Sequence, residues 1–227
     1  MNETEKIDLD TNTFDDEPRY EISVASSRGI TQLFELSDLE DINEALSPDD
    51  NLITLFIRMH EIDYHGKRKD EMLECKLTLL KDMFSKEESF YAFDERSQEH
   101  FNYYKALSKT GIFNEDFDDD NEDFWDYSSE YGVNIANGVM ERLYINPKYR
   151  GNNLATLILN NLRQIVLHST NLAIRGIVTY PKPDDGQSDD MKDIMIKTIK
   201  NCKFNEIPGE KNYYFRDYWY APLFYFK

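Results

Sequence analysis

Hydrophobic and polar positions alternate along the chain with two different periods, and these periods predict the order of its elements. Near the start, Tyr20, Ile22 and Val24 alternate with polar residues, which is typical of a short strand. Residues 37–48 begin with a capping-box pattern and end at a proline, so they predict a helix. Residues 52–62 are apolar enough for a buried strand or a helix, and periodicity leaves both open.

The segments that follow have less regular patterns. Residues 71–84 carry leucines at helical spacing and predict a helix. Residues 89–93 predict a short strand, and residues 98–107 predict a second helix that is rich in aromatic side chains. Residues 115–126 hold eight acidic residues without the ordered spacing or central glycine of a calcium-binding loop, so we expect a solvated acidic loop.

The second half of the chain has a clearer order. Residues 131–136 alternate as a strand, and the Asn-Gly pair at 137–138 is typical of a hairpin turn that leads into a returning strand at 139–145. A proline at position 147 ends that strand, because proline cannot donate to a sheet ladder. A polar turn follows, and residues 154–166 then repeat apolar side chains at three- and four-residue steps, which predicts a helix.

The remaining elements complete an α/β pattern. Residues 172–180 are rich in β-branched side chains and predict a strand parallel to 139–145, with the intervening helix as the crossover. A helix follows from about residue 189 to 202, capped by Ser188. Residues 213–215 and 219–226 supply further strand material. The chain therefore falls in the α/β class.

Composition narrows the classes of function. The 227 residues include 44 acidic and 26 basic side chains, a net charge of −18. A field of that sign repels nucleic acid and attracts cations, basic peptides and polyamines, although it can also serve solubility alone. Residues 1–18 are acidic and polar, and we expect a disordered tail.

The cysteines and the lengths of the apolar runs indicate the cellular compartment in which we expect the protein. Cys75 and Cys202 lie far apart in the sequence and have no spacing typical of a metal site, so we expect neither a disulfide framework nor a structural zinc. The first residues carry no apolar run, and no stretch is long and apolar enough for a membrane span. We therefore expect a cytoplasmic protein with no membrane partner and no nucleic-acid partner.

The most specific motif is the turn that joins the strand at 139–145 to the next helix, Leu143-Tyr-Ile-Asn-Pro-Lys-Tyr-Arg-Gly-Asn-Asn-Leu-Ala-Thr156. A strand, a glycine-bearing turn and a helix N-terminus aim backbone N–H groups at one point, which suits a phosphate, although such turns are also common without a ligand. The motif resembles the acyl-CoA-binding motif of the GNAT superfamily of N-acetyltransferases, Gln/Arg-x-x-Gly-x-Gly/Ala. Arg150 occupies the first position, Ala155 the last, and Asn153 the place of the middle glycine.

The resemblance spans residues 139–204 and implies a fold, a co-substrate and a set of contacts. It implies a GNAT-like mixed β-sheet flanked by helices over residues 19–227, with an enlarged N-terminal half and an insertion within residues 60–130. It implies acetyl-CoA as the co-substrate. The residues that the resemblance places against it are Leu143, Tyr144 and Ile145 at the thioester, and Arg150, Gly151, Asn152, Asn153, Ala155 and Thr156 at the pyrophosphate.

Two side chains are candidates for moving protons. Members of the family often place a carboxylate beside the motif strand, and Glu141 is two residues before Leu143; a cross-strand ion pair is the alternative role for it. The tyrosine that the family carries on its second helix is replaced here by Ile199. Tyr180 could protonate the leaving thiolate instead, or could serve packing alone. We assign no catalytic role to the four histidines.

The sequence thus predicts an enzyme that transfers an acetyl group from acetyl-CoA to a primary amine, with a cationic acceptor such as a polyamine, an aminosugar or a peptide amine. Two alternatives stay open. One is a GNAT-like domain that binds CoA or a protein without efficient catalysis. The other is an acidic interaction protein that imitates the charge of DNA. Whether the chain forms a homodimer is also left open.

Overall fold

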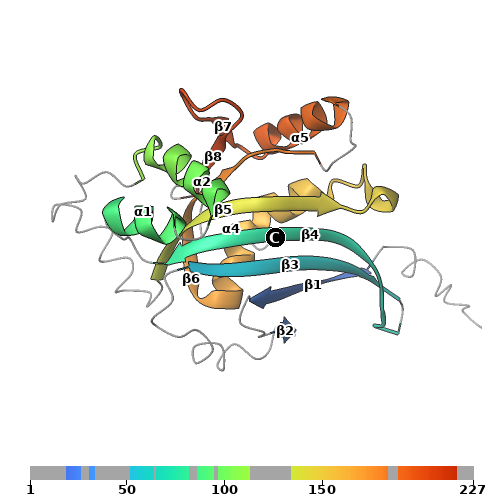
Figure 1. Ribbon diagram of the computed structural model, residues 1–227. Helices are drawn as coiled ribbons and strands as arrows, with labels where there is room; N and C mark the ends of the chain where they lie inside the picture. The colour runs from blue at the N-terminus through green and yellow to red at the C-terminus, as the bar shows by residue number, and fades with distance from the viewer. Residues whose placement is uncertain are drawn as a thin grey trace, which may run out of the picture.

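The computed structural model describes residues 19–26, 31–33, 52–63, 65–81, 86–94, 97–112, 134–183 and 189–218. Within these residues, eight strands form one sheet in the order β2-β1-β3-β4-β5-β6-β8-β7 (Figure 1). The strands are β1 Arg19–Ser26, β2 Thr31–Leu33, β3 Leu52–Ile62, β4 Arg68–Lys81, β5 Asn134–Ile145, β6 Leu172–Thr179, β7 Asn205–Glu206 and β8 Tyr214–Asp217. The helices are α1 Lys86–Asp94, α2 Gln98–Ser108, α4 Leu154–Thr170 and α5 Asp189–Asn201, with a 3-10 turn, η3, at Pro147–Tyr149.

The sheet is mixed. β5 and β6 are parallel, and α4 forms the crossover between them. The other neighbouring strands in the described part of the chain pair in the antiparallel sense. This arrangement confirms the predicted α/β class and the mixed sheet flanked by helices.

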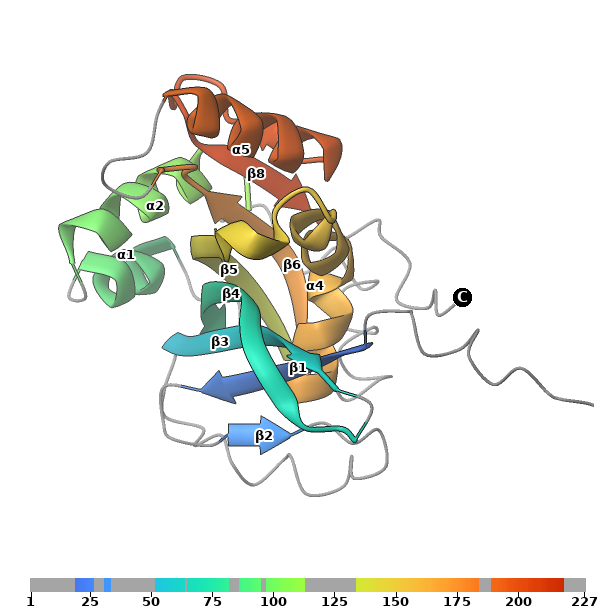
Figure 2. The same ribbon diagram turned by 90° about the vertical axis from the view of Figure 1, so that its right-hand side faces the viewer.

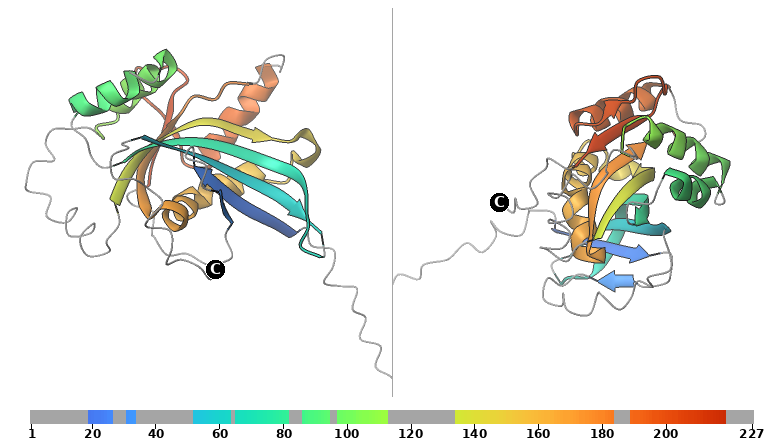
Figure 3. Two further views of the ribbon diagram at one scale, coloured as in Figure 1. Left: turned by 60° about the horizontal axis from the view of Figure 1, so that its bottom comes forward. Right: turned by 90° about the vertical axis from the view of Figure 1, so that its left-hand side faces the viewer.

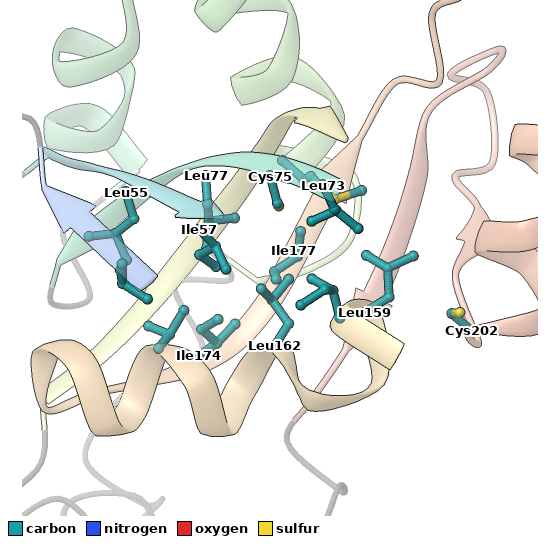
Figure 4. Packing of buried hydrophobic residues seen from close by; sticks show 14 of the residues in the cluster. Leu55, Ile57, Leu73, Cys75, Leu77, Leu159, Leu162, Ile174, Ile177 and Cys202 are labelled. Carbon is teal, nitrogen blue, oxygen red and sulfur yellow. The ribbon is translucent and has the colours of Figure 1, made fainter. Parts of the chain in front are cut away.

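Helices cover both faces of the sheet. α4 lies on one face and α1 and α2 lie on the other (Figures 2 and 3). The face under α4 holds the main core, which includes Leu55, Leu77, Leu162 and Ile177 (Figure 4), and α5 joins it through Ile199. We call the cluster under α1 and α2 the second core; it includes Phe93, Tyr103, Leu107, Val139 and Val178. Both faces of the central strands are therefore buried.

Several predicted elements are confirmed. The alternation at residues 20–24 belongs to β1, and the undecided segment 52–62 is a strand, β3. The aromatic-rich helix is α2, the helix after the turn is α4, and β6 is parallel to β5 as expected. These segments carry either a cap, a long helical period or a dense β-branched run, so the local signal and the tertiary structure agree.

The predicted hairpin at residues 137–138 is wrong. β5 runs without a turn from Asn134 to Ile145, and both residues of the pair lie inside it. Asn137 pairs with Leu80 on one side and with Gly176 on the other, so the chain is paired on both edges where a turn was expected. A Cβ on Gly138 would lie 3.2 Å from side-chain atoms of Ile177 and of Leu79, so this glycine serves close packing between strands.

Two assignments in the middle of the chain are also wrong. The predicted helix at 71–84 is the strand β4, in which Leu73, Cys75 and Leu77 occupy alternate positions and are fully buried. The other face of β4 is covered too, so its leucines appear at both parities and imitate a helical period. The predicted strand at 89–93 is the second half of α1, whose buried Ser89 and Phe93 are one helical turn apart.

Other predictions fall outside the described residues. These are the tail at 1–18, the helix at 37–48, the acidic loop at 115–126, the cap at Ser188 and the strand at 219–226. Across the described helices, none combines the length and the apolar character that crossing a bilayer requires.

Candidate functional site

The parallel strands β5 and β6 separate at their C-terminal ends. Their pairing ends at Met140 and Thr179, where β6 stops, whereas β5 continues to Ile145 and remains paired with β4. On the side away from β4, the backbone of residues 141–145 therefore has no strand partner among the described residues. We call this place the fork. An extended ligand that carries amide groups can hydrogen-bond to such an edge in the way that an added strand does.

A β-bulge lies at the start of the fork. Met140 pairs with Leu77 and Arg142 pairs with Lys76, so Glu141 is an extra residue in the β5–β4 ladder. A bulge bends the strand and re-aims its side chains. Here it directs Glu141 to the same face as Lys76, the face that α2 covers.

Three side chains hold the Glu141 carboxylate. Lys76 donates to Oε2, while the Thr78 hydroxyl donates to Oε1 and His100 Nε2 lies 3.2 Å from that same oxygen. The Glu141 side chain is 12% exposed. Burial raises the pKa of this carboxyl, but the hydrogen bonds from His100, Lys76 and Thr78 outweigh burial and lower the pKa to about 2. Glu141 is therefore ionised throughout the physiological range.

His100 joins Glu141 to a surface serine. Ser97 is the N-cap of α2, and its Oγ lies 2.7 Å from His100 Nδ1 and accepts the backbone N–H of His100 at 3.2 Å. The imidazole is buried, and the ring of Phe93 stacks on it with centroids 6.4 Å apart. Sequence reasoning missed His100, because its contact with Glu141 joins residues that are 41 positions apart in the chain.

Tyr180 lies on the face that carries Glu141. Its ring packs against Tyr213 at 5.1 Å between centroids, and Tyr213 in turn meets Tyr103 at 5.7 Å. Burial raises the pKa of the Tyr103 hydroxyl, and Glu99, Tyr213, Glu141 and Tyr180 raise it further. Glu141 and Tyr180 directly follow Met140 and Thr179, the last paired residues of β5 and β6, so the structure places both predicted residues at the start of the fork. Ile199, at the place of the family's tyrosine, is buried in the main core.

The predicted phosphate turn lies at the other end of the same strand segment. Arg150 Nε donates to the carbonyl of Ile145 at 3.2 Å, and Gly151 has a φ of +85°. Asn153 is the N-cap of α4 in the left-handed region, with φ 58° and ψ 19°, and its side chain makes no cap hydrogen bond. The first N–H groups of a helix have no intrahelical partner, so those of α4 point outward at this turn.

The turn is anchored to the neighbouring strands through Tyr149. The Tyr149 hydroxyl donates to Glu61 at 2.6 Å, and Lys148 Nζ donates to Asp70 at 2.8 Å. The hydrogen bond from Tyr149 is the main reason that the pKa of the Glu61 carboxyl is lowered. Asn146 also donates its backbone N–H to Met72, so the turn is fixed by β3 and β4.

The predicted cofactor residues thus lie along one continuous path. Leu143, Tyr144 and Ile145 lie in the length of β5 that has no strand partner on the side away from β4, and residues 150–156 form the turn and the first turn of α4. Glu141 lies at the end of this path that is away from the turn, about 14 Å from Ile145 along the extended strand. A ligand bound with a phosphate at the turn and an extended arm along β5 would bring its far end to Glu141.

Comparisons with known proteins find only weak structural similarities. No protein-family model matches the chain, and no curated protein matches it. Among solved structures, a mutant of the toxin AtaT bound to the C-terminus of the antitoxin AtaR and acetyl-CoA is 10% identical, with 71% of this chain and 68% of that chain covered and a TM-score of 0.34. AtaT complexed with acetyl-methionyl-tRNAfMet is 15% identical, with 72% and 71% covered and a TM-score of 0.35.

Arylalkylamine N-acetyltransferase 2 from Aedes aegypti is 13% identical, with a TM-score of 0.34; 65% of this chain and 56% of that one are covered. At these scores the similarities assign neither a family nor an activity.

Proposed function

We propose that the protein is an N-acetyltransferase that transfers the acetyl group of acetyl-CoA to a primary amine. The observation that carries the proposal is the continuity of the site: an outward-facing helix N-terminus, a length of β5 with one free edge and an ionised carboxylate follow one another along residues 141–156. These three features correspond to the three parts of the reaction, namely the pyrophosphate, the pantetheine arm with its thioester, and the amine.

The pyrophosphate of acetyl-CoA would bind at the N–H groups of residues 151–156. A helix N-terminus favours negative charge, and the left-handed backbone of Asn153 supports the turn in the place where the family motif has glycine. The pantetheine arm contains two amides, which can pair with the free edge of β5 at residues 143–145. The thioester would then lie at the fork, close to Glu141.

The acceptor amine would bind at Glu141. A carboxylate has about four lone-pair positions, and three donors already occupy Glu141, so one position on Oε2 remains for an ammonium or amine N–H. Tyr180 is the proposed proton donor to the departing thiolate. The net charge of −18 supports a cationic acceptor, such as a polyamine, an aminosugar or a peptide amine.

Isothermal titration with acetyl-CoA, followed by detection of free thiol with a panel of primary amines, tests this proposal. We expect binding and amine-dependent thiol release. Binding without thiol release would favour the CoA-binding module, and the absence of binding at millimolar acetyl-CoA would favour the acidic interaction protein.

Asn153→Asp is expected to weaken acetyl-CoA binding about 10-fold. The added carboxylate would face the pyrophosphate at a few ångströms, and repulsion between charges at that distance near a protein surface is worth about 1 kcal/mol or more. Aspartate is a good N-cap that tolerates left-handed backbone, so the fold is retained. Titration at two salt concentrations measures the effect, which shrinks as salt is raised.

Asn171→Asp is the matched control. Asn171 is the C-cap of the same helix and has the same left-handed conformation, with φ 56° and ψ 26°. It lies about 25 Å from the turn. We expect it to leave acetyl-CoA affinity unchanged. Equal effects of the two variants would place the pyrophosphate elsewhere.

A further inference from the structure

Lys76 is a primary amine that already lies at the carboxylate where the acceptor amine is placed. It belongs to β4, and its Nζ donates to Oε2 of Glu141. The bulge favours this contact, because it directs Glu141 to the face of the sheet that carries Lys76. The side chain of Lys76 is 32% exposed, so it is partly accessible from solvent.

Lys76 and the acceptor amine would share one oxygen of Glu141. Thr78 and His100 contact Oε1, whereas Lys76 contacts Oε2, the oxygen on which one lone-pair position remains. Two nitrogen atoms that share an acceptor oxygen lie within about 6 Å of each other, since each hydrogen bond is about 3 Å long. A thioester carbon that an amine at Oε2 can attack therefore lies in the range that the flexible four-carbon stem of Lys76 covers.

Other described lysines provide an internal comparison. Lys109 forms an ion pair with Glu210 away from the fork. The N–O distance equals that of the Lys76 pair, and the Lys109 side chain is more exposed, at 47% against 32%. Lys148, in the η3 turn, is 62% exposed. Because exposed amines meet dissolved acetyl-CoA more often, direct chemical acetylation would modify Lys109 and Lys148 at least as fast as Lys76.

We propose that Lys76 is a site of self-acetylation, an inference that rests on the proposed N-acetyltransferase function. The Lys76 ammonium first loses a proton to solvent, because only the neutral amine is a nucleophile. Nζ then attacks the thioester carbon of bound acetyl-CoA, so that a C–N bond forms and the C–S bond breaks. The sulfur leaves with the electron pair of the C–S bond, and the proton that Nζ loses on forming the amide passes through solvent to this thiolate.

Incubation of the whole chain with acetyl-CoA and no added amine tests the inference. We expect the release of a single thiol per chain, and peptide mass spectrometry is expected to place the acetyl group on Lys76. The rate should saturate with acetyl-CoA and should not depend on protein concentration, as for a reaction within one chain. Equal labelling of Lys76 and Lys109 would show direct chemical acetylation and would overturn the inference.

Lys76→Arg and Lys109→Arg are the matched variants. Arginine keeps the positive charge and can pair with the same carboxylate, but its guanidinium stays protonated and is not acetylated. In the absence of amine, we expect Lys76→Arg to slow thiol release at least about 10-fold and Lys109→Arg to leave it unchanged. Thermal unfolding checks that both variants retain the fold. Thiol release from Lys76→Arg at the wild-type rate would remove Lys76 as the acceptor.

Titration with acetyl-CoA separates this inference from the proposed function. We expect Lys76→Arg to bind acetyl-CoA as wild type does, because Lys76 lies at the end of the path that is away from the turn. A chain that acetylates added amines while Lys76 stays unmodified overturns self-acetylation and leaves the transferase intact. A wild-type chain that binds no acetyl-CoA overturns both.

Discussion

Replacing Gly176 with alanine is expected to destabilise the fold by about 2–3 kcal/mol, at the upper end of the range for overpacked positions. Gly176 lies on β6 and faces the second core, where a Cβ would lie 2.5 Å from Cε2 of Phe215 and 2.7 Å from Cδ1 of Ile112. Real Cβ atoms do not approach other atoms so closely, so the ring or the strand must move. The cause is space alone, because Gly176 does not have a positive φ.

Urea unfolding of Gly176→Ala beside Gly138→Ala measures this effect against a matched control. Gly138 lies on the paired strand β5, and a Cβ there would meet its closest neighbours at 3.2 Å, which small side-chain shifts relieve. The expected order of stability is wild type, then Gly138→Ala, then Gly176→Ala. If Gly176→Ala is as stable as Gly138→Ala, the side chains of the second core beside β6 move easily enough to accommodate a methyl group.

Replacing Glu141 with glutamine is expected to lower kcat/KM at least 100-fold while leaving acetyl-CoA affinity unchanged. Glutamine keeps the shape of the side chain but removes the charge that attracts the amine and orients His100. Lys76 then loses its ion-pair partner in a partly buried place. Steady-state kinetics and titration with acetyl-CoA separate the two effects. A variant with an unchanged rate would remove Glu141 from the mechanism.

Glu141→Gln is also expected to change the free energy of unfolding by an amount that depends on pH. The pKa of Glu141 is lowered from 4.5 to about 2 in the folded protein, so the folded state favours the ionised form. This stabilisation is on the order of 3 kcal/mol, is fully present above about pH 5, and is lost as pH falls through the folded pKa. The difference in free energy of unfolding between wild type and Glu141→Gln should therefore shrink from pH 6 to pH 3.

Glu210→Gln is the control for that series. Glu210 pairs with Lys109 away from the fork, and its side chain is about twice as exposed as that of Glu141, at 25% against 12%. We expect Glu210→Gln to have a small effect on the free energy of unfolding, as for an ion pair at the surface. If Glu210→Gln lowers the free energy of unfolding at pH 6 as much as Glu141→Gln does, the Glu141 carboxyl is not specially stabilised.

The elements after residue 153 could be predicted from the sequence because their local signals are consistent with the tertiary structure. The helical period after residue 153 and the β-branched run of β6 each have one interpretation. β4 could not be predicted, since both of its faces are buried and its leucines satisfy two periods at once. The Asn-Gly pair at 137–138 is a strong local turn signal that pairing on both edges of β5 overrides.

The part of the candidate site that neighbouring residues form could be predicted from the sequence, whereas the contacts between residues far apart in the chain could not. The motif located the turn, and the left-handed conformation of Asn153 is one that asparagine tolerates. The surroundings of Glu141 come instead from Lys76, Thr78 and His100, whose contacts span 65, 63 and 41 residues. No spacing in the sequence connects these positions, because the topology of the sheet and the position of α2 bring them together.

The bulge at Glu141 shifts by one residue the positions of β5 that face the main core. Ahead of it, the even-numbered Ala136 and Met140 face the main core, whereas after it the odd-numbered Leu143 and Ile145 pack there. Deleting Glu141 would make the ladder regular and leave Leu143 and Ile145 on the main-core face, whereas deleting a residue after the bulge would turn the side chains between the deletion and the bulge to the opposite face. A family descended from this chain could therefore lose Glu141 and keep the register of β5, but it would lose the carboxylate at the fork.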